Sequence, residues 1–95
     1  MYAVVRRYQG ASQLFDELAR RQGEIEQVFR GVPGFISYTA VRSGDGGVSI
    51  TICEDRAGTE ESSRRAADWV RQTVPAAAGS PPEITEGEVL FQFGR

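Results

Sequence analysis

The feature that most constrains the fold is a glycine-rich turn near the middle of the chain. The turn, Ser43-Gly44-Asp45-Gly46-Gly47, separates two runs of alternating apolar and polar residues. An Asp-Gly pair between two such runs is typical of a β-hairpin. The sequence therefore predicts two antiparallel strands, at residues 35–42 and 48–55.

Amphipathic helix patterns flank this hairpin on both sides. Ser12 is a favoured N-cap residue, and apolar side chains at helical spacing predict a single helix over residues 12–30, which Pro33 and Gly34 close. Thr59 would cap a second helix that ends at Pro75. The side chains expected on the inner stripe of this second helix are Ala66, Ala67, Val70, Thr73 and Val74.

Two further segments complete the element order. Residues 2–9, rich in Tyr and Val, predict a first strand. Residues 76–82 are rich in Gly and Pro and predict a loop, after which Val89, Phe91 and Phe93 alternate as a last strand. The order strand, helix, hairpin, helix, strand is the βαββαβ layout of an α+β, ferredoxin-like fold, with both helices on one face of an antiparallel sheet.

The length and the uncovered sheet face bear on assembly. Ninety-five residues suit a single domain, and we expect residues 1–95 to form one. Helices on one face leave large apolar side chains on the other, and exposed apolar patches of this kind usually mark an interface. We predict a homodimer that pairs one open sheet face with another. A monomer with a sparsely covered sheet and a complex with a different protein are the alternatives.

Composition excludes several function classes. The net charge is −2, which gives no basic surface for nucleic acid, and no apolar run reaches the roughly 18 residues needed to span a membrane. All 11 basic residues are Arg, and the chain has no Lys, His or Asn. Histidine acid–base chemistry, histidine metal ligation and Schiff-base chemistry are therefore excluded, and no metal site is expected. The single cysteine, Cys53, cannot form an internal disulfide, and we expect a cytoplasmic location.

Several segments resemble a known family. These are Gly34-Phe35-Ile36-Ser37-Tyr38, the run from Val48 to Arg56, Trp69-Val70 and Gly87-Glu88-Val89. In element order and spacing they resemble the dimeric α+β barrel superfamily, and within it the antibiotic-biosynthesis-monooxygenase-like domains of bacteria. The resemblance implies a homodimer whose two sheets form a barrel, with a pocket between sheet and helices in each subunit.

The resemblance also implies a choice of activities. Characterised relatives oxidise polycyclic aromatic phenols with molecular oxygen and no bound cofactor, or degrade haem with a set of Asn, Trp and His. This chain has neither Asn nor His, so only Trp69 of that set could be carried over. The first hypothesis is a cofactor-independent monooxygenase, or a related enzyme, that acts on a hydrophobic aromatic small molecule. The alternative is a non-catalytic dimer that binds a small ligand or another protein.

Four residues are candidates for binding such a molecule. Trp69 would form one wall of an aromatic pocket, or else cover the core with its N–H in water. Tyr38 could orient a hydroxylated ring, or pack across the strands. Gln22 interrupts the apolar stripe of the first helix, where a buried amide needs a partner or a polar cavity. Arg42 could balance an anionic ligand, or remain solvated. Cys53 has no histidine to activate it and is expected to be a packed side chain.

Overall fold

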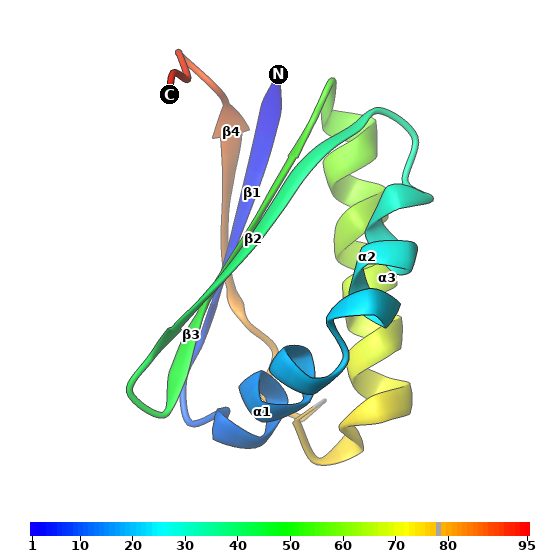
Figure 1. Cartoon of the computed structure of the whole chain (residues 1–95), viewed down its shortest axis with the longest axis vertical. Coiled ribbons are helices and arrows are strands. Elements are labelled where there is room, and N and C mark those ends of the chain that lie inside the picture. The colour runs from blue at the N-terminus through cyan, green and yellow to red at the C-terminus, as the bar shows by residue number, and fades with distance from the viewer. Residues whose placement is uncertain (78) are drawn as a thin grey trace.

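A four-stranded antiparallel sheet is covered on one face by helices (Figure 1). The computed structural model describes residues 1–77 and 79–95. The strand order is β2-β3-β1-β4, and the helices all lie on the same side of the sheet. The predicted α+β, ferredoxin-like fold is thereby confirmed. The elements are β1 (Tyr2–Tyr8), α1 (Ser12–Arg20), α2 (Gln22–Arg30), β2 (Phe35–Ser43), β3 (Gly46–Cys53), α3 (Arg56–Thr73), the 3₁₀ helix η1 (Pro75–Ala77) and β4 (Glu83–Glu88).

The predicted hairpin is present. Strands β2 and β3 pair antiparallel up to Ser43 opposite Gly46, and Gly44 takes a positive φ of 60° in the turn. A residue with a Cβ would be strained at this φ, which explains a glycine there. A β-bulge between Phe35 and Ser37 shifts the register at the start of β2. Because of the bulge, Phe35 and Tyr38 both lie on the helix side of the sheet.

The single helix predicted over residues 12–30 is wrong. Arg21, with φ −116° and ψ 37°, interrupts it and separates α1 from α2. The reason lies in the residues at the break, since positions 20–24 hold no apolar side chain and include Gly23, a poor helix former. Nothing there would be buried by a straight helix. Figure 1 shows α1 and α2 running in different directions, so that each can turn its own apolar residues toward the sheet.

Both predicted helix caps are corrected. The N-cap of α1 is Ala11, without a side-chain cap, rather than Ser12. Helix α3 starts earlier than expected, because the Asp55 carboxylate accepts a hydrogen bond of 3.0 Å from the Gly58 backbone N–H. Asp is at least as good an N-cap residue as Thr, and Asp55 precedes Thr59 in the chain. Thr59 is instead buried inside the helix.

The inner face of α3 is rotated relative to the prediction. Ala67 is exposed, whereas Ser62 and Trp69 are buried together with Val70. The sheet decides this orientation, because Arg6 on β1 presents a buried guanidinium that donates to Ser62. Because the Arg6 guanidinium is buried and needs hydrogen-bond acceptors, α3 turns the side of the helix that carries Ser62 toward the sheet.

The last strand lies before the predicted one. Strand β4 is Glu83–Glu88, paired with β1, whereas Val89 to Phe93 lie outside the sheet and Phe91 and Phe93 are 76% and 83% exposed. The Val89 N–H already bonds to the Met1 carbonyl, so β1 offers no further residue to pair with. An edge strand tolerates the acidic composition of β4. Residue 78, within the predicted 76–82 loop, lies outside the described residues.

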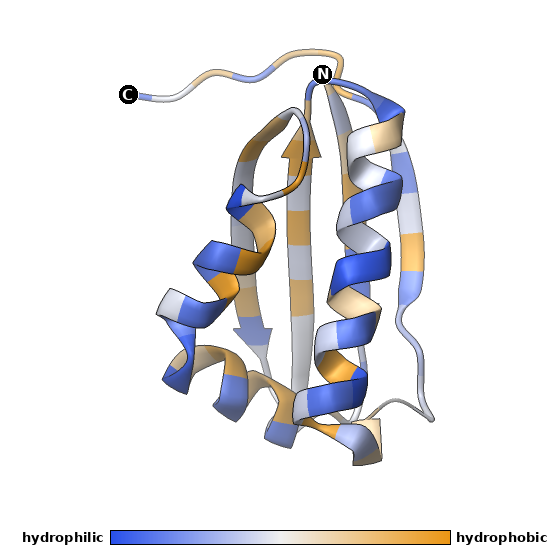
Figure 2. Cartoon of the chain, turned by 90° about the vertical axis from the view of Figure 1, so that its right-hand side faces the viewer, coloured by the Kyte–Doolittle hydropathy of each residue, from blue (hydrophilic) through white to orange (hydrophobic). Residues whose placement is uncertain are grey.

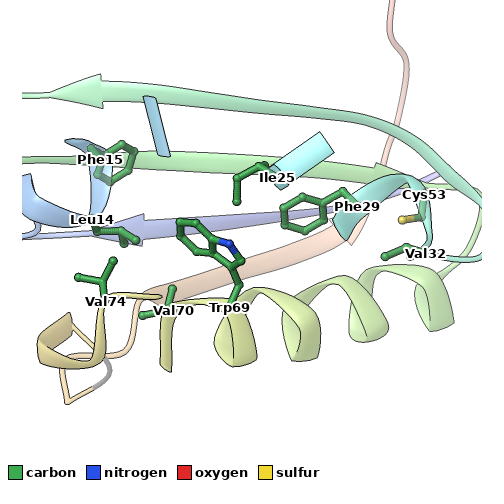
Figure 3. Packing of buried hydrophobic residues seen from close by; sticks show 9 residues of the cluster. All are labelled: Leu14, Phe15, Ile25, Phe29, Val32, Cys53, Trp69, Val70 and Val74. Carbon is green, nitrogen blue, oxygen red and sulfur yellow. The ribbon is translucent and has the colours of Figure 1, made fainter. Parts of the chain in front are cut away.

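The core lies between the helices and the sheet. Figure 2 shows hydrophilic residues spread over the outward sides of the helices. Figure 3 shows the buried apolar cluster between the two layers. Its members are Leu14, Phe15, Ile25, Phe29, Val32, Cys53, Trp69, Val70 and Val74. Within the described part of the chain, no helix is long and apolar enough to cross a membrane.

Candidate functional site

An open cavity of about 640 Å³ lies between the helix pair α1–α2 and strand β2. This volume is in the range typical of small-molecule sites. Aromatic side chains from both layers line it, namely Phe15, Phe29, Phe35 and Tyr38. The break at Arg21 helps to form the cavity, since it turns α2 along β2 while α1 stays at the hairpin end of the sheet (Figure 1).

A stacked aromatic pair forms part of the cavity wall. The rings of Phe29 and Tyr38 are 4.2 Å apart, centroid to centroid, and are inclined by 15°. Burial raises the pKa of Tyr38, and the nearby Ser49 hydroxyl and Arg6 guanidinium offset this only in part. Tyr38 is therefore a neutral phenol at physiological pH. Its aromatic ring can stack with a flat ligand in the cavity.

Charged and amide side chains surround the cavity. Arg42 donates to the Asp16 carboxylate at 2.9 Å, and Arg30 donates to Glu26 at 2.7 Å. These two arginines are exposed and already paired, so their charges are largely neutralised and screened by solvent. Gln22 also lines the cavity.

Gln22 corrects one expectation. Its predicted place in the middle of a buried stripe is wrong, because the helix breaks at Arg21 and Gln22 becomes the first residue of α2. There its side chain is exposed and lies at the cavity. The amide is thus available to a ligand without having to be buried in the core.

Three of the four candidate residues come together, and the fourth lies apart. Tyr38, Gln22 and Arg42 all line the 640 Å³ cavity. Trp69 lies in the core and is 7% exposed (Figure 3). Its indole N–H donates a hydrogen bond of 3.0 Å to Glu24, rather than facing water. With Phe29 and Tyr38, Trp69 borders a separate void of about 20 Å³, which is too small for an aromatic ligand.

Cys53 is a packed side chain, as predicted. It is fully buried, and the Gly58 backbone of α3 lies so close that a Cβ on Gly58 would come within 2.8 Å of the Cys53 Cβ. Burial raises the pKa of its thiol, with the Asp55 charge acting in the same direction. The thiol is therefore protonated and a poor nucleophile.

Arg6 is the residue that sequence reasoning missed. It is 1% exposed, and its guanidinium donates to Ser49 Oγ, Thr51 Oγ1, Ser62 Oγ and Ser63 Oγ at 2.8 to 3.3 Å. The signal that could have found it is strand register, because Arg6 pairs with Ser49 and shares its face with Val4 and Tyr8. Two hydroxyl residues on the facing strand indicate a polar partner buried inside the sheet–helix layer.

Solved structures with the same architecture were found at low sequence identity. A protein of unknown function from Nitrosomonas europaea is 20% identical, with a TM-score of 0.71 over 99% of this chain and 93% of that chain. The heme-degrader MhuD from Mycobacterium tuberculosis, with two hemes bound in its active site, is 16% identical, with a TM-score of 0.61 over 99% and 100%. A monooxygenase from the gene ActVA-Orf6 of Streptomyces coelicolor, in complex with nanaomycin D, is 19% identical, with a TM-score of 0.63 over 99% and 89%.

These structures settle the fold. The chain has the same α+β fold as these structures, which include a monooxygenase and a heme-degrader. The resemblance seen in the sequence is confirmed at this level. No protein-family model matches the sequence, and no curated protein matches it either. The activity of this chain therefore depends on the chemistry of its own residues, which the fold alone does not determine.

The cavity does not fit a haem. Haem iron in proteins takes His, Cys, Met or Tyr as an axial ligand, and the sequence has no His. Cys53 is packed against α3 and does not line the cavity. Among the described residues that line the cavity, Tyr38 is the one with a ligand atom of this kind, and burial raises the pKa of its phenol. A neutral phenol is a poor ligand for iron.

Proposed function

We propose that this chain is an oxygenase that oxidises a hydrophobic aromatic phenol with molecular oxygen and without a bound cofactor. The observation that carries the proposal is the aromatic-walled cavity of about 640 Å³, which has a stacked Phe29–Tyr38 pair on one side and the Gln22 amide at its edge. The likeness of the fold to a monooxygenase crystallised with nanaomycin D supports it.

Each lining residue has a role in this proposal. A flat ring system lies against Tyr38, and the Gln22 amide donates a hydrogen bond to a ring oxygen. Arg42 sits at the cavity edge, where its pairing with Asp16 leaves it a weak contact for an anion. Trp69 supports the aromatic wall from the core side, since it borders the small void next to Phe29 and Tyr38.

The chemistry balances without a reductant. An electron-rich phenol that has lost its proton transfers electrons to O₂, and a ring C–H becomes a C=O. One oxygen atom enters the product, the other leaves as water, and the phenol, now a quinone, has supplied all four electrons. The protein needs to bind the phenol, favour its ionised form and limit access of water.

Binding without turnover is the second candidate function. Glu26 is the carboxylate that lines the cavity among the described residues, and Arg30 holds it at 2.7 Å. A carboxylate engaged in this way is a weak general base. If the ligand's hydroxyl does not ionise on its own, the cavity would bind the ring and leave it unchanged.

Oxygen consumption tests the proposal. Purified protein would be mixed with a panel of naphthols, hydroxyanthracenes and anthrones, whose conversion to a quinone requires an added oxygen atom, and O₂ uptake and quinone formation would be measured together. We expect equal amounts of O₂ consumed and quinone formed with at least one tricyclic phenol. Gln22→Ala should lower kcat/KM by about tenfold through loss of one hydrogen bond to the developing charge. Gln27→Ala is the matched control, because Gln27 is exposed on the same helix and does not line the cavity.

The outcomes separate the two candidates. Saturable binding of a phenol with no O₂ uptake above the protein-free rate would reject the oxygenase and leave the binding protein. If Gln22→Ala and Gln27→Ala lowered kcat/KM equally, Gln22 would have no specific role in binding the phenol.

We also propose that the chain acts as a homodimer through the open face of the sheet. Side chains on this face include Val5, Val41, Val48, Ile50 and Ile52, and the register places them beside one another. Val41 is 45% exposed. The adjoining segment after β4 carries three exposed apolar residues, Leu90, Phe91 and Phe93. An apolar area of this kind is better covered by a second copy than by water.

A further inference from the structure

Arg6 is a buried charge without a carboxylate partner. Eight of the 11 arginines form ion pairs within 4 Å. Within residues 1–77 and 79–95, the three arginines without such a pair are Arg6, Arg7 and Arg95. Arg7 and Arg95 are exposed, so water solvates them, whereas Arg6 is 1% exposed.

The hydroxyls around Arg6 satisfy most of its donors but not its charge. Four neutral oxygens, from Ser49, Thr51, Ser62 and Ser63, accept its hydrogen bonds, and its Nε has no partner among the described residues. Burial lowers the pKa of Arg6, and the ionisable groups that act against this are two tyrosines and a thiol, all neutral at physiological pH. A guanidinium stays protonated even so. Its positive field therefore extends into the surrounding low-dielectric region without local compensation.

This charge lies behind the cavity wall. The Arg6 Cζ is 5.9 Å from the centroid of the Phe29 ring, and Phe29 stacks on Tyr38, with both rings lining the cavity. The two arginines at the cavity edge, Arg30 and Arg42, are exposed and paired. Among the described arginines near the cavity, Arg6 is thus the one whose charge has no carboxylate partner, and it lies beside the ring of Phe29, which lines the cavity.

We infer that Arg6 makes the cavity selective for anions, so that an aromatic phenol binds there as its phenolate. The inference rests on the cavity of the proposed function and adds a specificity-determining residue to it. At an effective dielectric constant of about 20, a unit charge on the order of 10 Å away favours a phenolate over the neutral phenol by about tenfold. Binding of a neutral ring of the same shape gains nothing from it.

For two tyrosines near Arg6, burial raises the pKa more than the Arg6 charge lowers it. Burial raises the pKa of Tyr8 and of Tyr38, and the Arg6 charge acts against this rise without overcoming it. Both phenols are largely surrounded by protein. A ligand in the open cavity keeps water at its edge and is desolvated less, so the charge outweighs burial for the ligand.

The experiment measures the ionisation of a bound dye. Alizarin, a dihydroxyanthraquinone whose visible spectrum changes on deprotonation, would be titrated with pH in the presence of saturating protein. The apparent pKa of bound alizarin should lie about one unit below that of the free dye. Arg6→Met should abolish this shift, because it removes the charge and keeps much of the volume. Arg7→Met is the matched control, since Arg7 is the next residue on the same strand, is exposed and points to the other face; it should keep the shift.

Two further measurements keep the inference falsifiable if Arg6→Met does not fold. Arg6→Lys keeps the charge and should keep the shift. In the wild-type protein, affinity for alizarin should rise about tenfold as pH passes through the pKa of the free dye, whereas affinity for its dimethyl ether should not change. A shift retained in Arg6→Met, or a wild-type affinity that stays flat or falls as alizarin ionises, would overturn the inference. Tight binding of the anion without O₂ uptake would reject the oxygenase alone.

Discussion

The indole N–H of Trp69 donates a hydrogen bond of 3.0 Å to the Glu24 carboxylate, and this contact joins α3 to α2 over the core. The rest of the indole is buried against the apolar cluster (Figure 3). Helix α2 carries Gln22 and Phe29 to the cavity, so the contact also helps to hold the helix that forms one cavity wall. Trp69 thereby acts on the candidate site through α2 rather than by touching a ligand in the large cavity.

Removing the acceptor of this hydrogen bond should destabilise the protein. Glu24→Ala is expected to lower the free energy of unfolding by about 1 kcal/mol, because the indole N–H loses its partner. Glu24→Gln keeps an acceptor oxygen and should lose less. Urea denaturation followed by circular dichroism measures both. In a Trp69→Phe background the difference between the two variants should become smaller, and what remains reflects the contact of Glu24 with Arg21.

Two glycine-to-alanine changes in helices should have opposite effects. Gly23 in α2 has open space around the position of a Cβ, so Gly23→Ala should raise the free energy of unfolding by about 0.5 kcal/mol through helix propensity. At Gly58 in α3, a Cβ would lie 2.8 Å from the Pro33 carbonyl oxygen and from the Cys53 Cβ. Gly58→Ala should therefore lower the free energy of unfolding by about 2 kcal/mol. Thermal or urea unfolding tests both variants. An increase in the free energy of unfolding in both would contradict the close packing of α3 on β3.

Alkaline pH should destabilise the protein through its buried tyrosines. Burial raises the pKa of Tyr8 and Tyr38 above the ordinary value of 10.0, so the folded state holds these protons more tightly than the unfolded state. Their contribution to stability is complete below about pH 10 and is lost as pH rises through the higher folded-state values. The urea midpoint of unfolding should decrease as pH rises above about 10. In Tyr38→Phe the midpoint should decrease less steeply with pH.

Replacing the buried charge of Arg6 by an apolar side chain of similar length should not unfold the protein. Arg6→Met removes a desolvated cation that has no carboxylate partner, so we expect the free energy of unfolding to stay within about 1 kcal/mol of wild type or to rise. Arg6→Ala should lower it by about 2–3 kcal/mol because it leaves a cavity. Chemical denaturation compares the two. A large loss in Arg6→Met would mean that the hydroxyl network stabilises the fold more than the isolated charge destabilises it.

The proposed dimer can be broken from the open sheet face. Ile50 lies on that face between Val5 and Thr39, and Ile50→Glu would place a charge in the middle of the interface. Sedimentation velocity should show a dimer for the wild type and a monomer for Ile50→Glu. Ala67→Glu, on the exposed side of α3, is the control and should remain dimeric. A wild type that sediments as a monomer would reject the homodimer.

Most element types, and their order along the chain, could be predicted from the sequence alone. The Asp-Gly turn with its alternating flanks, and the apolar spacing of the helices, depend on local backbone preferences and side-chain periodicity, which a sequence displays directly. The same patterns led to Tyr38 and Arg42, because a strand next to a recognisable turn leaves little freedom in where its residues lie. Gln22 lines the cavity, but the reason for naming it as a candidate was incorrect, since it is exposed at the start of α2 and not buried in a continuous helix.

The inner face of α3, the position of β4 and the burial of Arg6 could not be predicted without the tertiary structure. Each depends on a partner distant in the sequence. Arg6 reaches residues 43 to 57 positions away, and β4 takes its place because β1 provides a pairing edge that ends at Met1. The energy that buries a charge or selects an edge strand comes from these long-range contacts. Local propensity does not reveal these contacts, because it describes each segment without its neighbours in space.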